Sequence, residues 1–269
     1  MKSPSSAPFS GRHLVNRTSG TNIKVPVIRA SFWIIKILTT GMGETTSDFF
    51  VRRFDPVPVV LLAAIGLFMI LLAQWLSRRY RPWLYWLAVV MVSVFGTMAA
   101  DVLHIVIGVP YLASTLFFSA ALTVVLVLWR TTEGTLSIHS VRTRRRELFY
   151  WGTVLTTFAL GTATGDMTAT TLDLGYLFSG VLFAAVFVVP VVAYFWFGMN
   201  EVAAFWFAYI VTRPLGASFA DWMGVPPDRG GLNWGTGPVS IVLAILIATM
   251  VVASRGDRRR ESSEAAAAD

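Results

Sequence analysis

Apolar residues fill eight stretches of roughly twenty residues, separated by short segments that contain charged residues, Gly or Pro. A helix of about 20 residues crosses the hydrocarbon core of a bilayer, which is about 30 Å thick. The pattern therefore predicts an all-α membrane protein with eight transmembrane helices. We expect these helices at residues 32–50, 59–76, 83–106, 111–129, 148–169, 174–197, 202–223 and 234–253.

The two ends of the chain lack this pattern. Residues 1–30 are rich in Ser, Pro, Gly and Arg and show no helical period, and residues 255–269 are polar. Such segments cannot bury enough apolar surface to offset the entropy lost on ordering. We expect two disordered tails on either side of a membrane domain at 31–254.

Composition agrees with the membrane class. Hydrophobic residues make up 55% of the 269 residues and charged residues only 14%, whereas a soluble domain carries about 25% charged residues. The absence of Cys excludes disulfides and thiolate ligands. The net charge of +7 fits basic loops that orient membrane helices better than nucleic-acid binding. We expect a lipid bilayer, and no nucleic acid, as the partner.

The positions of Lys and Arg predict the topology. With the N-terminus inside, the inner segments hold 17 Lys and Arg residues, and the outer loops hold three, Arg52, Arg53 and Arg229. Because cytoplasmic loops carry the excess of basic residues, both termini are expected in the cytoplasm.

One motif occurs four times: an aromatic residue and Trp, nine residues, Gly, four residues, and Asp. Repeats at fixed spacing predict a repetitive architecture, here four parallel two-helix units at about 31–77, 83–130, 148–198 and 202–254. Parallel repeats are related by an axis along the membrane normal. The copies are Phe32-Trp33, Gly43 and Asp48; Tyr85-Trp86, Gly96 and Asp101; Tyr150-Trp151, Gly161 and Asp166; and Phe205-Trp206, Gly216 and Asp221.

The first copy carries a polar stripe. Lys36, Thr40, Glu44 and Asp48 recur every four residues, so they share one helix face. Glu44 and Asp48 repel each other at this spacing unless a positive group lies between them. The stripe indicates either an ion path or a face turned toward lipid headgroups.

The second and third copies offer further candidates. Asp101 and His104 lie three residues apart, a spacing that allows both to ligate a cation; the alternative is a capping Asp and an interfacial His. Gly161 and Gly165 precede Asp166 and favour close helix packing.

In the fourth copy, Arg213 and Pro214 are expected to interrupt the seventh span. Proline removes a backbone donor, and the freed carbonyls either coordinate a cation or only mark a kink. Arg213 lies well inside the core and needs an acidic partner, for which we expect Glu44 or Asp48.

Several stretches resemble a known family: Phe32-Trp33-Ile34-Ile35-Lys36, Gly43-Glu44-Thr45, Gly134 to Ser140, and Thr212 to Ala217. Residues 24–253 resemble bacterial membrane proteins built from four tandem two-helix repeats of unknown function, each with a characteristic Trp. The resemblance implies the eight-span architecture and the bacterial inner membrane. It implies no activity.

The charged residues of the spans predict the function. Five acids and two bases give the core a net charge of −3 if all are ionised, and each unpaired charge costs about 2.5–3.5 kcal/mol. We therefore expect a transporter or exporter of a small cation, either a proton or a hard divalent ion such as Mg²⁺ or Mn²⁺. The expected ion path comprises Lys36, Glu44, Asp48, Asp101, His104, Asp166, Arg213 and Asp221, with Asp48, Asp101, Asp166 and Asp221 as metal ligands.

The alternative is a non-transporting membrane scaffold, in which the repeat residues only set helix packing. An enzyme is not expected, since the spans hold no Ser-His or paired-His arrangement. In either case the odd-numbered helices should form an inner ring, because they carry the ionisable residues, and the even-numbered helices should face lipid.

Overall fold

The computed structural model describes residues 23–77 and 79–268. The disordered tail expected at residues 1–22 lies outside these residues. Within them the chain forms eight long helices and no β-strand, which confirms the all-α fold. The helices are α1 (Ala30–Arg53), α2 (Pro56–Leu76), α3 (Pro82–Asp101), α4 (Tyr111–Glu133), α5 (Arg144–Asp166), α6 (Gly175–Phe197), α7 (Glu201–Gly224) and α8 (Thr236–Ala268).

Short local signals set several helix ends. The side chain of Asn200 accepts hydrogen bonds from the backbone N–H groups of Val202 and Ala203 and begins α7, and Asp55 caps α2 through Val57. At the other end, α4 and α6 stop at Gly134 and Gly198, whose φ angles of 72° and 66° suit glycine. These ends separate the apolar runs into distinct helices.

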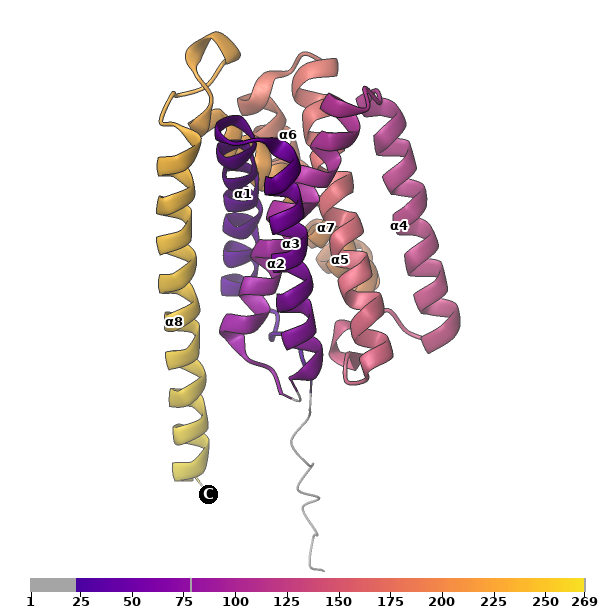
Figure 1. Ribbon diagram of the computed structural model, residues 1–269. Helices are drawn as coiled ribbons and strands as arrows, with labels where there is room; N and C mark the ends of the chain where they lie inside the picture. The colour runs from indigo at the N-terminus through magenta and orange to yellow at the C-terminus, as the bar shows by residue number, and fades with distance from the viewer. Residues whose placement is uncertain (1–22, 78, 269) are drawn as a thin grey trace, which may run out of the picture.

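The odd-numbered helices form the inner ring. Helix α1 contacts α3 and α7, and both of these contact α5. Each even-numbered helix packs outside, mainly against the odd-numbered helix of the following repeat: α2 on α3, α4 on α5, α6 on α7, and α8 on α1. Figure 1 shows α4 and α8 on opposite flanks of this bundle. The expected division into inner and outer helices is confirmed.

Burial follows the same division. Most buried polar side chains lie on α1, α3, α5 and α7, whereas the even-numbered helices expose large apolar side chains. Six of the eight helices in the described residues are long and apolar enough to cross a membrane. Helices α1 and α5 are not among the six. Helix α1 carries Lys36, Glu44 and Asp48, and the apolar part of α5 is interrupted by many Thr and Gly residues. Both lie in the inner ring, where other helices surround their polar residues.

Both ends of the membrane domain differ from our expectation. Part of the expected N-terminal tail, residues 23–29, packs on the domain: Val25 is buried, and the Lys24 ammonium lies 2.5 Å from a carboxylate oxygen of Glu147. Helix α8 continues to Ala268 instead of ending at 253. Its last residues are mostly Ala, Glu and Arg, which are strong helix formers.

Candidate functional site

The aromatic-Trp pairs join the four repeats at one end of the inner ring, which we call the Trp end. In every case the aromatic residue before Trp contacts the Trp of the next repeat, and the fourth repeat contacts the first. The ring centroids are 5.7 Å apart for Phe32 and Trp86, 5.7 Å for Tyr85 and Trp151, 6.3 Å for Tyr150 and Trp206, and 5.6 Å for Phe205 and Trp33. Such distances are typical of favourable aromatic pairs, so this part of the motif closes the ring.

The repeat glycines form a second closed circle nearer the centre. A Cβ atom on each would collide with the side chain that lies seven residues after the Trp of the next repeat. The pairs are Gly43 with Ser93, Gly96 with Phe158, Gly161 with Arg213, and Gly216 with Thr40. Only glycine allows these helices to approach so closely. This confirms the packing interpretation for Gly161 and extends it to all four repeats.

A buried ion pair lies at the middle of the ring. One guanidinium nitrogen of Arg213, Nη2, donates to Glu44 Oε2 at 2.6 Å, to Thr162 Oγ1 at 2.7 Å, and to Thr97 Oγ1. The side chain of Arg213 is 0% exposed and that of Glu44 is 6% exposed. All four inner helices therefore meet at one guanidinium, and the predicted pairing of Arg213 with Glu44 is confirmed.

Sequence reasoning missed the role of Thr97 and Thr162. Both follow the repeat glycine directly, at the position that Glu44 occupies in the first copy. This shared register was the available signal. In the fourth copy the same position is Ala217, and Arg213 reaches the centre from the preceding turn.

Lys36 lies in an aromatic cage beside the ion pair. Its Nζ atom is 4.0 Å from the ring centroid of Phe158 on α5 and 4.2 Å from that of Tyr209 on α7. The side chain is fully buried, and Nζ has no hydrogen-bond partner among the described residues. Both contacts are at the short end of cation–π geometry.

The repeat Asp residues gather at the other end of the ring, which we call the Asp end. The carboxylates of Asp48, Asp101, Asp166 and Asp221 all interact electrostatically with that of Glu44. Asp48 also forms an ion pair with Arg52 at 2.8 Å. Asp221 is buried and the other three are partly exposed.

These acids do not form a compact ligand set. Within the part of the chain that the structure describes, no three His, Asp or Glu side chains are placed so that they could hold a metal ion. The four Asp residues predicted as metal ligands thus lie at the same end of the ring without converging on one point. Two of them are followed by a π-helical turn, at Val102–Val106 and Met167–Thr171, a feature frequent at functional sites.

His104 packs against the connection from α3 to α4. Its Nδ1 atom lies 3.1 Å from the carbonyl oxygen of Val109, its Nε2 atom lies 3.4 Å from Ser114 Oγ, and its ring packs on Tyr111. Both nitrogens are used within the α3–α4 connection, so the geometry favours the structural alternative for His104.

Pro214 does not interrupt the seventh helix, contrary to our expectation. Helix α7 runs from Glu201 to Gly224 with Pro214 inside it. The carbonyl of Thr212 accepts a hydrogen bond from the Thr40 hydroxyl at 3.1 Å. Contacts from α1 and α5 thus support this region of α7 as a continuous helix.

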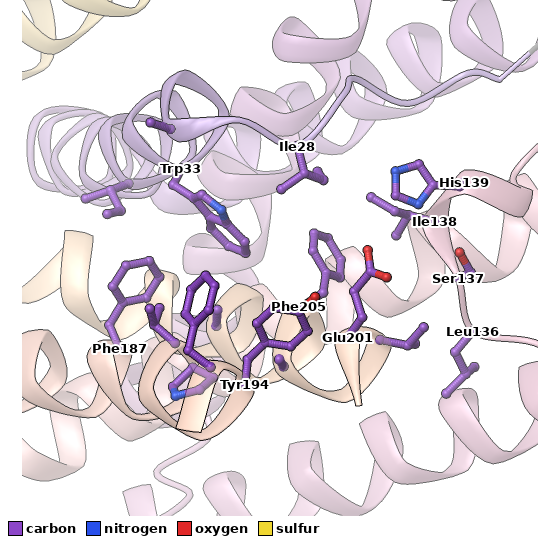
Figure 2. A pocket seen from close by; sticks show the side chains of 18 of the residues that line it. Ile28, Trp33, Leu136, Ser137, Ile138, His139, Phe187, Tyr194, Glu201 and Phe205 are labelled. Carbon is purple, nitrogen blue, oxygen red and sulfur yellow. The ribbon is translucent and has the colours of Figure 1, made fainter. Parts of the chain in front are cut away.

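An apolar groove of about 680 Å³ lies on the outside of the Trp end. Figure 2 shows Trp33, Phe187, Tyr194 and Phe205 around it, with Glu201 and His139 toward one side. A groove of about 430 Å³ beside α8 is lined by Trp86, Leu87 and Val90, which correspond to Trp33, Ile34 and Ile37 of the first groove. Both grooves therefore lie on the outer side of the ring, where neighbouring repeats meet, and are separate from the charged centre.

Comparison with known proteins agrees with this repeat geometry. The family model described as Repeat of Unknown Function (DUF347) matches residues 31–80, 84–135, 149–200 and 204–259. No curated protein and no solved structure matches the chain. The four matches coincide with the four units of one inner and one outer helix. The chain therefore belongs to the Repeat of Unknown Function family (DUF347), with four tandem copies of its repeat.

Proposed function

We propose that this protein is a membrane transporter of a small cation, which passes through the inner ring. The observation that carries the proposal is the placement of the repeat Asp residues. The Trp and Gly positions are accounted for by the two packing circles. In contrast, the side chains of Asp101, Asp166 and Asp221 have no hydrogen-bond or ion-pair partner among the described residues.

The four acids at the Asp end favour cations over anions. Charges of one sign around an opening with apolar walls raise the local concentration of counter-ions. Ionised groups within a membrane domain are costly, and they mark ion pathways when they face the bundle interior. The Asp end places four carboxylates on the inner helices of the ring, which supports a cation as the transported ion.

Beyond the Asp end, the centre of the ring supplies oxygen atoms that could bind a cation. Glu44, Thr97 and Thr162 present one carboxylate and two hydroxyl oxygens around the Arg213 guanidinium. Oxygen ligands suit hard cations such as Mg²⁺ and Mn²⁺. Arg213 holds these oxygens in the present arrangement, so a passing cation replaces its guanidinium there when the ion pair opens.

The orientation follows from the basic loops. We propose eight membrane crossings in a bacterial inner membrane, with the Trp end and both termini in the cytoplasm and the Asp end outside. The inner ring shields the polar residues of α1 and α5 from lipid, which allows these helices to cross.

Cation entry into vesicles containing the purified protein tests the role of the Asp residues. The double variant Asp101→Asn/Asp166→Asn should lower the initial rate of Mn²⁺ entry by about tenfold or more, because it removes half of the repeat carboxylates. Asp228→Asn, in an exposed loop at the same end, is the matched control and should keep the wild-type rate. Equal rates for all three proteins would contradict the proposal.

A non-transporting scaffold is the second candidate. The bonds from Arg213 to three other inner helices favour it, since they tie the repeats together without any need for transport. A scaffold predicts no cation entry above protein-free vesicles and a loss of stability when the central bonds are removed. A transporter predicts both cation entry and the loss of stability, so the entry rate separates the two.

A further inference from the structure

Lys36 is the one described lysine that has no acidic partner. The other, Lys24, forms an ion pair with Glu147. Lys36 lies inside the ring on α1, fully buried between Phe158 and Tyr209, with no acceptor for its Nζ atom. A residue needed only to fill this apolar space would not carry an amine, because an unpaired buried charge is costly.

The groups around Lys36 leave it without compensation. From α7, Tyr209 supplies a ring face, and the Arg213 guanidinium lies 5.5 Å from the same Phe158 ring that Lys36 contacts. Tyr150 of α5 and Tyr85 of α3 share a hydroxyl–hydroxyl hydrogen bond of 2.5 Å toward the Trp end. On α1 itself, Glu44 lies two turns away and is already held by Arg213.

The positive charges at the centre of the ring oppose the entry of a further cation as long as Lys36 is protonated. With Lys36 protonated, the centre holds two positive groups, Lys36 and Arg213, against the single carboxylate of Glu44. A further cation would increase the positive excess in a region of low dielectric, where like charges repel strongly. Loss of one proton from Lys36 removes one positive charge and allows the cation to enter.

We propose that Lys36 couples cation transport to proton transport, carrying the proton that is exchanged for the cation. This inference rests on the proposed transport function. In the step, one Nζ–H bond breaks, the electron pair stays on nitrogen, and water on one side of the membrane accepts the proton. After the cation leaves, the neutral amine takes a proton from water on the other side, and the cycle closes without any redox change.

The test uses vesicles that contain the full-length protein, a trapped pH indicator and externally added Mn²⁺. Wild type should move protons in the direction opposite to Mn²⁺. Lys36→Met has a side chain of similar length without a charge, and it should lose the Mn²⁺-dependent pH change at least about tenfold relative to the Mn²⁺ flux. Lys24→Met, the matched control, should keep the wild-type ratio.

A second variant covers the case in which Lys36→Met fails to fold. Lys36→Arg keeps a permanent positive charge, because a guanidinium does not lose its proton in proteins. It should reduce Mn²⁺ flux at least about tenfold while retaining cooperative thermal unfolding.

The outcomes separate the coupling from the transport function. A wild-type protein that moves no Mn²⁺ would overturn the proposed function itself. Mn²⁺ flux without a pH change in wild type would overturn the coupling alone. The coupling would equally be wrong if Lys36→Met kept the wild-type ratio of proton to Mn²⁺ movement, or if Lys36→Arg carried Mn²⁺ at the wild-type rate.

Discussion

Arg213 donates hydrogen bonds to residues from each of the other three inner helices, Glu44, Thr97 and Thr162. The sequence predicted the ion pair, because an arginine deep in an apolar helix needs an acid and the first repeat held an excess of acids. It did not predict the two Thr partners, since Thr residues are scattered through the same spans. The aromatic cage of Lys36 could not be predicted either, because its two rings come from α5 and α7 and meet only in the folded ring.

Replacing Arg213 tests the central ion pair. Arg213→Gln leaves the Glu44 carboxylate buried without its partner, which should destabilise the protein by about 3–5 kcal/mol. The double variant Arg213→Gln/Glu44→Gln removes both charges and should recover most of that loss. Chemical denaturation in detergent measures both effects. A single variant as stable as wild type, or a double variant no more stable than the single one, would show that the pair does not act as described.

At the scale of helices, the repeat motif is explained by contacts between neighbouring units. The aromatic residue before Trp and the repeat Gly are separated by about three helical turns, so they lie on the same face of each inner helix. The aromatic pair and the close helix contact on that face both reach the next repeat. The sequence predicted the helices and their parallel direction from apolar length and repeat spacing. The packing of each outer helix on the following repeat depends on contacts between helices far apart in the chain, which no local pattern reports.

Gly43→Ala tests the close contact between α1 and α3. The added methyl group would overlap Ser93, so we expect a loss of about 1–3 kcal/mol in the free energy of unfolding. Gly152→Ala is the matched control on α5, where the nearest atom to the new Cβ is Val125 Cγ1 at 3.9 Å. The control should be neutral or slightly stabilising, because Ala favours helix over Gly by about 1 kcal/mol. Equal effects at the two positions would argue against a close helix contact at the repeat glycine.

Glu147→Gln tests the packing of residues 23–29. Lys24 is buried against Glu147 and donates to its carboxylate at 2.5 Å. Neutralising the acid leaves the ammonium without its charged partner, so the segment should detach more often. Tryptic cleavage after Lys24 should then be faster than in wild type, while Glu133→Gln, at the partly exposed pair with Arg145 and Arg146, should change it little. Unchanged cleavage in Glu147→Gln would mean that the ion pair does not hold the segment.

At the scale of the whole molecule, the ring has two chemically different ends, one aromatic and one acidic, with charged groups buried between them. The sequence predicted this polarity, because Trp and Asp lie 15 residues apart in every copy. It did not predict that the Asp residues stay apart, because their positions relative to one another depend on how the four inner helices pack.

The proposed orientation is testable because the chain has no Cys. A cysteine at Asp228, in the loop between α7 and α8, should react with a membrane-impermeant thiol reagent added outside intact cells. A cysteine at Thr132, exposed near the end of α4, should react only after the membrane is opened. The reverse pattern would invert the orientation, and labelling of both positions from outside would rule out the eight-crossing arrangement.

The most direct test of transport through the ring is Mn²⁺ entry into vesicles that carry wild type or the double variant Arg213→Gln/Glu44→Gln. Wild type should admit Mn²⁺ faster than protein-free vesicles, with a rate that saturates. The double variant should retain most of its stability yet be at least about tenfold slower, because it lacks the central carboxylate ligand. Wild-type entry no faster than the leak of protein-free vesicles, or full activity in the folded double variant, would contradict cation transport through this centre.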